Sequence, residues 1–329
     1  MKKRILVARA IFPDVLERLS QYFEVTANQT DHIYSTDELI AEIAHVDGLL
    51  STGSERITSA VLASTSQLKA VCNMAVGYNN IDIDAATRKG IMVTNTPDVL
   101  NETTADFAWA LMMACARRVT ESEHWLRAGK WVKWRYDTLL GADLHGSTLG
   151  IIGMGRIGQA VARRSIGFDM RVIYHNRSWL AADLEQHANN AQLVSKEELL
   201  RTADHVMLVL PYSPQTHHTI GATELALMKP SATLTNVARG GIVDDVALIS
   251  ALRARRIAAA GLDVFENEPA LHPDFLGLSN VVLTPHIASA SEPTRRAMAN
   301  CAADNLIAAL SGMTPPHLLN PTAQQKDSQ

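Results

Sequence analysis

The sequence predicts an α/β protein with two doubly wound parallel-sheet domains and a cleft between them. Three observations lead to this prediction. Short apolar or β-branched runs alternate with helix-like stretches almost from end to end, which is typical of parallel βαβ units. After residue 118 the alternation starts again with a glycine-rich segment. The length of 329 residues also exceeds the size at which a single hydrophobic core usually keeps growing.

The first half of the chain alternates predicted strands with predicted helices. Its opening, MKKRILVARA, is basic and then apolar like a signal peptide, but the apolar run is short and contains Arg9. We therefore interpret it as a first buried strand. Helices are predicted over Pro13–Gln21 and Ser35–Ala44. The five predicted strands of this half are RILVARA, FEVTAN, VDGLLST, KAVCNMAV and IMVTN.

The second half begins with a long helix and continues with six predicted strands. The helix is expected over Asn101–Arg118, because NETT is a capping-type start and a long apolar pattern follows it. Six strands that begin with a glycine fingerprint are typical of a Rossmann-like dinucleotide-binding domain. These strands are LGIIG, RVIYHN, HVMLVLP, TLTNVA, GLDVF and VVLTPH.

The last predicted helix, Glu292–Leu310, has no strand after it. A chain that leaves the first domain near Pro97 and returns after His286 crosses between the domains twice. We therefore expect residues 1–98 and 289–329 to form a substrate-binding, flavodoxin-like domain, and residues 99–288 to form the dinucleotide-binding domain. Clefts between such domains are common ligand sites.

The composition excludes several classes of partner. The net charge of −4 provides no basic surface for nucleic acid or an anionic membrane. No stretch is long and apolar enough to span a bilayer. The cysteines Cys72, Cys115 and Cys301 share no metal-like spacing and lie in apolar surroundings, so we expect buried, reduced thiols in a cytoplasmic protein.

Three glycines after the first strand of the second half predict a phosphate site. Gly153, Gly155 and Gly158 fit the G-x-G-x-x-G pattern of a strand-to-helix turn, where backbone N–H groups and the helix N-terminus can hold a pyrophosphate. Glycines alone often only tighten a turn. The apolar strand before them and the six-strand pattern after them favour the binding interpretation.

The residues after the next strand indicate which nicotinamide cofactor is preferred. NAD enzymes commonly have Asp or Glu there, about 20 residues after the first glycine, to bind the ribose 2′-hydroxyl. This chain has donors and a positive charge at that place, which suit a 2′-phosphate. We therefore predict NADPH as the preferred cofactor, with NADH as the alternative. The four residues are His175, Asn176, Arg177 and Ser178.

Three residues further along could carry the reduction of a 2-oxo acid. Arg239, at the end of TLTNVA, offers a guanidinium fork for the carboxylate, although it could also cap a helix. His286, after VVLTP, could be the proton donor, although most of the 12 histidines must have other roles. Glu268 could stabilise the charged imidazole and fix its tautomer.

Three further residues have an open interpretation. Val76 and Gly77 lie in the loop MAVGYNNID, where their N–H groups could bind a substrate carboxylate, or the loop could be an ordinary βα turn. Asp263, in GLDVF, could orient the nicotinamide amide or a neighbouring side chain, and a structural role is equally consistent with its position.

Together these motifs resemble the D-isomer-specific 2-hydroxyacid dehydrogenase family over nearly the whole chain. GMGRIG, NVARGGIVDD, GLDVFENEP and TPHIASAS are similar to its signature segments, in their usual order. The resemblance implies that Arg239, Glu268 and His286 are catalytic, that Val76 and Gly77 bind the carboxylate, and that no metal takes part. It also implies that the cofactor is contacted or flanked by Arg156, Ile157, Pro211, Val237, Ala238, Asp263 and Ala288.

Within that family the chain resembles the glyoxylate and hydroxypyruvate reductases, including the bacterial 2-ketoaldonate reductases. Trp134 stands where that branch has a tryptophan that reaches the partner subunit's substrate pocket, although packing is an alternative for it. Asp245 and Ala288 depart from the residues usual in the family, Glu and Gly. The resemblance implies a cytoplasmic homodimer that reduces glyoxylate, hydroxypyruvate and longer 2-keto acids such as 2-ketogluconate.

Two other functions remain as alternatives. D-3-phosphoglycerate dehydrogenases share the signatures but prefer NAD and often carry an added regulatory domain. A nucleotide-sensing corepressor or scaffold on the same fold could keep all three catalytic residues. The lack of basic patches and of added recognition tails counts against the second alternative.

Overall fold

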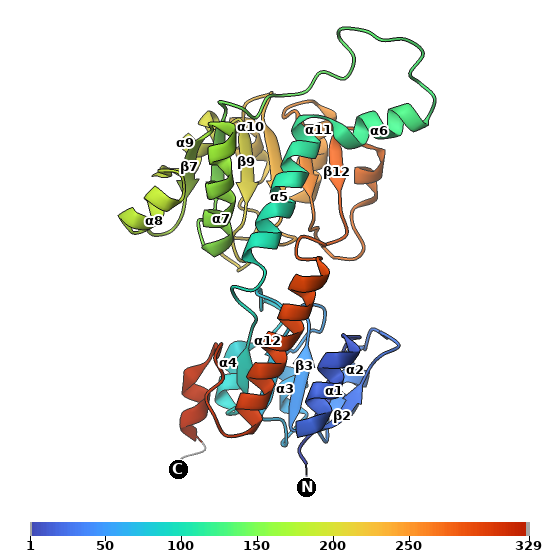
Figure 1. The fold of residues 1–329 in the computed structure, drawn as a ribbon, viewed down its shortest axis with the longest axis vertical. Coiled ribbons are helices and arrows are strands. Elements are labelled where there is room, and N and C mark those ends of the chain that lie inside the picture. The colour runs from blue at the N-terminus through green and yellow to red at the C-terminus, as the bar shows by residue number, and fades with distance from the viewer. Residues whose placement is uncertain (1, 327–329) are drawn as a thin grey trace. The chain divides into compact units, whose positions relative to one another are not determined.

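The computed structural model describes residues 2–326 and divides into two compact units. The first comprises Met1–Leu100 and Ser291–Gln329, of which residues 1 and 327–329 lie outside the described part, and the second comprises Asn101–Ala290. Each contains one parallel β-sheet with helices on both faces (Figure 1). The predicted fold class, two doubly wound parallel α/β domains, is confirmed.

The first unit is built on a five-stranded sheet in the order β2-β1-β3-β4-β5. This is the flavodoxin-like order, with the chain reversing direction next to β1. The opening segment forms β1 and not a separate helix, as its short apolar run predicts. The strands are β1 (Arg4–Val7), β2 (Glu24–Ala27), β3 (Gly48–Ser51), β4 (Ala70–Asn73) and β5 (Met92–Thr94).

Helices cover both faces of this sheet. The helix α12 (Glu292–Leu310), which matches the predicted range, packs with α1 on the face that presents Ile5, Val7 and Leu50. The other face presents Leu6 and Leu49 to a second apolar core. The remaining elements are α1 (Pro13–Tyr22), α2 (Thr36–Ile43), α3 (Ser59–Ala63), α4 (Ile83–Arg88) and the 3-10 helix η3 (Pro321–Lys326).

The second unit is built on a seven-stranded sheet in the order β12-β11-β10-β9-β6-β7-β8. Counted from β6, this is the dinucleotide-binding order 3-2-1-4-5-6 with one more strand at the far edge. The chain crosses to the other half of the sheet between β8 and β9. The strands are β6 (Thr148–Ile152), β7 (Arg171–His175), β8 (Gln192–Leu193), β9 (His205–Leu208), β10 (Thr233–Asn236), β11 (Ala259–Leu262) and β12 (Val281–Leu283).

Apolar cores lie on both faces of the second sheet, because alternate side chains of each strand point to opposite faces. The long helix α5 and the helix α7 cover one face, and α9, α10 and α11 lie over the other (Figure 1). The helices are α5 (Asn101–Ala116), α6 (Val119–Arg127), α7 (Arg156–Arg164), α8 (Ala182–His187), α9 (Lys196–Thr202), α10 (Ala222–Leu227) and α11 (Asp245–Arg253), with 3-10 helices η1 (Ser165–Phe168) and η2 (Pro273–Gly277).

The cysteines are thiols, two of them fully enclosed. Cys72 and Cys115 are buried, and burial raises the pKa of each thiol to about 12. Cys301 is only half-buried, in contrast to the expectation of three buried thiols. Of the helices in the described part of the chain, none has both the length and the apolarity that crossing a membrane requires.

Candidate active site

The predicted site residues of the second unit come from loops at the carboxyl-terminal edge of its sheet, where the strands end. Because all seven strands are parallel, their carboxyl ends meet at that edge, which is where ligands bind in open α/β sheets. The glycine turn follows β6, and His175 ends β7. Arg239 follows β10 by three residues, and Glu268 and His286 follow β11 and β12.

Each glycine of the turn after β6 has a separate structural reason. Gly153 has a φ of +99°, and a Cβ there would lie 2.7 Å from Val209 O. A Cβ at Gly158 would lie 2.3 Å from Gly153 O, so the third glycine lets α7 pack against the turn. In front of Gly155 the space is open. Since Gly155 caps the N-terminus of α7, a pyrophosphate can approach the helix N–H groups there.

Of the four polar residues at the end of β7 and just after it, two contact backbone atoms and two are exposed. Asn176 Oδ1 accepts a hydrogen bond from Met154 N at 3.0 Å, which ties the segment to the glycine turn. His175 Nδ1 lies 3.1 Å from Val194 O. Arg177 and Ser178 are exposed, and their side chains contact no hydrogen-bonding partner within residues 2–326. They are therefore available to a ligand.

Glu268 and His286 are brought together by the loops after β11 and β12. Glu268 Oε2 lies 2.7 Å from His286 Nδ1. Glu268 Oε1 accepts a second hydrogen bond, at 2.8 Å, from the backbone N–H of Phe265. Because Nδ1 faces the carboxylate, the tautomer that donates to Glu268 leaves Nε2 to exchange a proton with a substrate.

The electrostatics of the site favour an ionised Glu268. Burial acts to raise the pKa of this carboxyl, but the hydrogen bonds from His286 and Phe265 and the nearby charge of Arg239 outweigh it, so the pKa is lowered. Burial also lowers the pKa of the Arg239 guanidinium, against the attraction of Glu268. An arginine stays charged despite such a shift. A carboxylate, an imidazole and a fixed cation therefore lie in one neighbourhood.

Asp263 organises the loop that carries His286. It is completely buried, and its Oδ1 accepts hydrogen bonds from Thr284 Oγ1 at 2.7 Å and Ile287 N at 2.8 Å. Its Oδ2 accepts from Ala288 N at 2.8 Å. All these partners are in the 284–288 loop, so within this unit the Asp263 carboxylate acts on the segment around His286.

Two functional positions were missed by the sequence analysis. Thr284 contributes the hydroxyl bound by Asp263. Asn236 is buried, accepts from Ala238 N at 3.0 Å and donates to Arg239 O at 3.3 Å, so it shapes the turn that presents Arg239. A buried amide must have hydrogen-bond partners for its polar atoms. The Asn that opens NVARGG, three residues before the arginine, could have suggested this role.

The other predicted cofactor neighbours differ in exposure. Val237, Ala238 and Ala288 are buried, and their side chains belong to the apolar cores beneath the edge of the sheet. Any contact with a cofactor would therefore involve mainly their backbone. Pro211 and Arg156 are exposed at the same edge, and Ile157 is half-buried in the first turn of α7.

In the first unit, Val76 and Gly77 lie in the loop after β4. The carbonyl oxygens of Ala75 and Val76 accept hydrogen bonds from Thr96 N at 3.0 Å and Asn95 Nδ2 at 2.9 Å. The C=O and N–H of a trans peptide point in opposite directions. The N–H groups of Val76 and Gly77 therefore point away from those partners, in an orientation suited to an anion.

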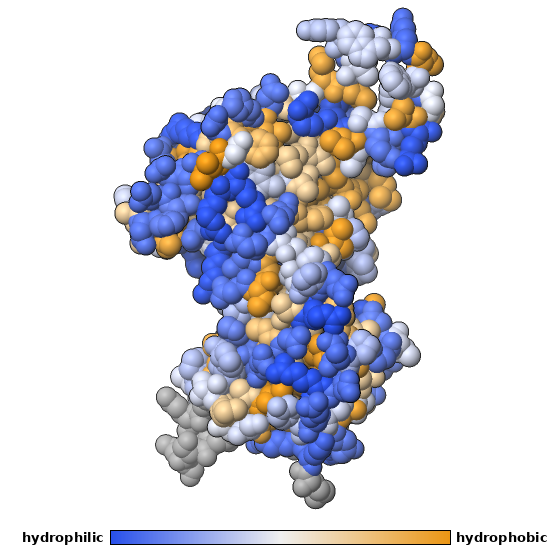
Figure 2. Space-filling model, in the orientation of Figure 1, coloured by the Kyte–Doolittle hydropathy of each residue, from blue (hydrophilic) through white to orange (hydrophobic). Residues whose placement is uncertain are grey.

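Trp134 lies in a segment that projects from the second unit. We call residues 119–142, that is α6 and the loop after it, the arm (Figure 1). Trp134 is 74% exposed, and its ring contacts Tyr136 edge to face at 6.4 Å. Figure 2 shows apolar residues along this projecting segment.

The arrangement can bind a dinucleotide and transfer a proton next to a fixed cation. The chain is similar to known proteins. Residues 109–288 match the family described as D-isomer specific 2-hydroxyacid dehydrogenase, NAD binding domain. The chain is 45% identical to a glyoxylate reductase of Thermococcus onnurineus and 46% identical to one of Aeropyrum pernix, in each case over 97% of this chain and 96% of the relative.

A solved structure extends the similarity to the fold. It is the NADPH-dependent glyoxylate/hydroxypyruvate reductase of Sinorhizobium meliloti in complex with NADP and malonate. The sequence identity is 35%, the TM-score is 0.88, and the match covers 98% of each chain.

Proposed function

Because the chain belongs to the D-isomer specific 2-hydroxyacid dehydrogenase family, and is thus an NAD(P)-dependent oxidoreductase, we propose that it reduces small 2-oxo acids with NADPH as the preferred cofactor. The proposed substrates are glyoxylate and hydroxypyruvate, with 2-ketogluconate as a longer one, and the products are D-2-hydroxy acids. The observation that carries the proposal is the Glu268–His286 contact of 2.7 Å beside the charge of Arg239.

In the proposed mechanism the chain binds the acid and supplies a proton. Arg239 holds the substrate carboxylate and the carbonyl oxygen through its planar fork. A bound nicotinamide cofactor supplies the hydride. His286, protonated and stabilised by Glu268, donates its Nε2 proton to the oxygen that becomes the hydroxyl. The N–H groups of Val76 and Gly77 are proposed as further carboxylate donors.

The proposed roles of the two units follow from their sheets. We assign cofactor binding to the second unit, because its strand order and its glycine turn are those of dinucleotide-binding domains. In that unit Asp263 is assigned mainly to positioning the 284–288 loop beside the nicotinamide. We assign substrate recognition to the first unit, because the Val76–Gly77 turn presents N–H groups suited to a carboxylate.

NADPH preference is supported by the exposed residues after β7. Arg177 and Ser178 are available to a 2′-phosphate, and no carboxylate of this segment stands where it would repel one. The similar Sinorhizobium meliloti enzyme is NADPH-dependent. NADH remains the alternative cofactor if Arg177 is only a solvated residue.

A homodimer is proposed because apolar side chains of the arm are exposed to solvent in the single chain. Apolar side chains exposed together are common at protein–protein interfaces. In a dimer Trp134 would reach the partner subunit. The exposed residues are Val119, Leu126, Trp131, Val132, Trp134, Tyr136 and Leu140, with exposures between 52% and 88%. We also propose a cytoplasmic location, because the enclosed thiols Cys72 and Cys115 suit a reducing compartment.

Initial rates test this proposal. NADPH and NADH are each compared with glyoxylate, hydroxypyruvate, 2-ketogluconate, pyruvate and 3-phosphohydroxypyruvate. The expected result is the highest kcat/KM for glyoxylate or hydroxypyruvate with NADPH. Highest efficiency for 3-phosphohydroxypyruvate with NADH would favour a phosphoglycerate dehydrogenase, and no turnover of any acid would favour a sensor or scaffold.

A further inference from the structure

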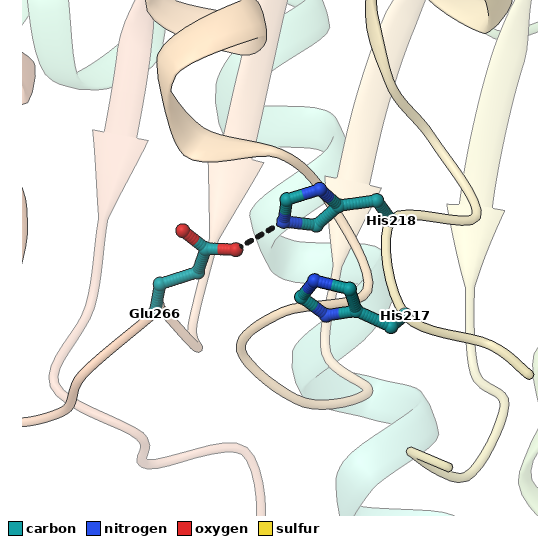
Figure 3. A group of neighbouring side chains, drawn as sticks. All are labelled: His217, His218 and Glu266. Carbon is teal, nitrogen blue, oxygen red and sulfur yellow. Dashed lines mark hydrogen bonds and ion pairs between the residues drawn. The ribbon is translucent and has the colours of Figure 1, made fainter. Parts of the chain in front are cut away.

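A second group of polar side chains lies at the same sheet edge, separate from Glu268 and His286 (Figure 3). His217 and His218 are in the loop after β9, and Glu266 is in the loop after β11. One nitrogen of each histidine and one oxygen of Glu266 lie within 4.8 Å of one another. Across residues 2–326 this is the one group of three or more such side chains that could hold a metal ion.

The three side chains lie close together, with the two imidazole rings side by side. His218 Nε2 lies 2.5 Å from Glu266 Oε1, and the two imidazole rings stack with centroids 3.8 Å apart. The hydroxyl of Tyr212 lies 3.3 Å from His217 Nδ1. That contact leaves His217 Nε2 as the nitrogen for a ligand, and Figure 3 shows the His217 ring directed toward the other two side chains.

Backbone hydrogen bonds fix the loop that carries the histidines. His218 N donates to Gly241 O at 2.8 Å, and Ile220 N donates to Ile242 O at 3.1 Å. Gly241 has a φ of +78°, and a Cβ there would lie 2.9 Å from the Tyr212 ring. On the other side, Glu266 N donates to Asp245 Oδ2 at 3.2 Å. The backbone that carries the three side chains is therefore held in place before any ligand binds.

The surroundings also resemble those of a metal ligand. Asp244 Oδ2 lies 3.9 Å from His218 Nδ1, within ion-pair distance but beyond a hydrogen bond, on the side where ligating histidines commonly have a carboxylate. His217 is exposed, and the side chains of His218 and Glu266 are 37% and 26% exposed, so an ion can enter from solvent.

We propose that His217, His218 and Glu266 bind a divalent transition-metal ion of the zinc type. Two imidazoles and one carboxylate suit Zn²⁺, whereas Ca²⁺ and Mg²⁺ prefer oxygen ligands. At a tetrahedral ion with bonds of about 2.1 Å, ligand atoms lie about 3.4 Å apart, so Glu266 has to move back from His218 by about 1 Å. Because an imidazole binds a metal in its own ring plane, the two stacked rings also have to turn until their nitrogens point at the same ion. Water would take the fourth position.

This site would act on the catalytic loop without taking part in the reaction. Glu266 is two residues before Glu268, in the turn where Phe265 N donates to Glu268 Oε1 at 2.8 Å. An ion held by Glu266 would restrain this turn and link it to the loop after β9. The proposal depends only on the three ligands and not on the substrate or cofactor proposed above.

Zn²⁺ titration tests the site. Protein without a histidine tag is treated with a chelator, dialysed and titrated with Zn²⁺ by isothermal titration calorimetry. The wild type should bind one ion per chain. His218→Ala and Glu266→Gln should each weaken binding by at least about tenfold, since even outer partners of a metal site contribute about 10- to 100-fold. Zn²⁺ should raise the Tm of the wild type and not of these variants.

A matched control is available in the first unit. His32 Nε2 lies 3.2 Å from Glu38 Oε1, but this pair belongs to no three-ligand group of the described chain. His32→Ala should bind Zn²⁺ like the wild type. If His218→Ala does not fold, the exposed His217→Ala takes its place. A wild type that binds no Zn²⁺, or ligand variants that bind as well as the His32 control, would overturn the proposal.

Discussion

The charge of Glu268 in the proposed active site can be tested by a single substitution. Glu268→Gln keeps the side-chain shape and the acceptor for Phe265 N but removes the charge that stabilises protonated His286. The lowered pKa of Glu268 means that this charge is present across neutral pH. In the variant, the alkaline fall of kcat for reduction should therefore move to lower pH, as a pH–rate profile will show.

His286→Ala supplies the comparison for that experiment. Loss of the proton donor should lower kcat by about 10²- to 10⁴-fold. An unchanged pH profile in Glu268→Gln would remove Glu268 from the mechanism. Near-normal turnover in His286→Ala would mean that another group is the acid.

Arg239 is predicted to recognise substrate and not to hold the fold. Its side chain donates one hydrogen bond, at 2.8 Å, to the carbonyl of the adjacent Ala238. Arg239→Lys keeps the charge and loses the fork, so kcat/KM should fall by about 10- to 150-fold, the equivalent of one strong charged hydrogen bond. Its Tm should change little. A collapse of Tm with intact kcat/KM in the remaining folded enzyme would assign Arg239 to structure.

Asp245 is predicted to make stability depend on pH. Burial, with the negative charges of Glu266 and Asp244, raises the pKa of this carboxyl to about 6. The folded state therefore binds more protons than the unfolded state between about pH 4 and pH 6, and stability falls as the pH rises through that window, by at most about 3 kcal/mol. Asp245→Asn should remove this fall and raise Tm at pH 8.

Thermal melts from pH 4.5 to 8 measure the effect, with the exposed Glu17→Gln as the control. Asn can still accept the hydrogen bond from Glu266 N, so the comparison isolates the charge. Parallel pH curves for Asp245→Asn and the wild type would show that Asp245 ionises as an ordinary surface acid.

At the scale of elements, a substitution just after β7 tests the preference for NADPH over NADH. Arg177→Ala should reduce kcat/KM for NADPH by about 10- to 150-fold, because a charge-assisted bond to the 2′-phosphate is lost, and should leave NADH nearly unaffected. Arg171→Ala, at the other end of the strand and bonded to Gln192, is the matched control. If kcat/KM fell equally with NADPH and NADH, Arg177 would be a solvated residue without a role in cofactor choice.

Elements with a clear apolar run were predictable from the sequence, whereas the shortest strand was not. Helix α12 was predicted at its observed bounds, and in the structure Ser291 caps its N-terminus. Strand β8, Gln192–Leu193, was missed, since two residues at a sheet edge carry no periodic signal. Strand β11 begins at Ala259, earlier than GLDVF suggested, because alanine and glycine are weak strand formers that burial alone places there.

For the site, residue types were predictable but contacts were not. The meeting of Glu268 and His286 depends on two loops that are brought together by the pairing of β11 with β12. The cluster of His217, His218 and Glu266 depends on loops after β9 and β11, which are not neighbouring strands in the sheet. No spacing in the sequence reports such contacts between distant segments.

At the scale of the whole molecule, substitutions in the arm test the proposed homodimer. Val132 and Tyr136 are 87% and 88% exposed. Their replacement by aspartate should shift the proposed dimer to monomer in light scattering, since charges at the centre of an apolar interface are strongly unfavourable. Val246→Asp, at an exposed position on α11, should leave the mass unchanged. A monomeric wild type would contradict the dimer.

The split of the first unit has a consequence for the newly made chain. Its sheet is complete at residue 94, but α12, which covers Ile5, Val7, Leu50, Ala70 and Cys72 together with α1, is translated only after the second unit, residues 101–290. At about 5–20 residues per second, those 190 residues take the ribosome about 10–40 s. During that time α12 is not present to cover this apolar face, so the face is exposed to aggregation and to chaperones.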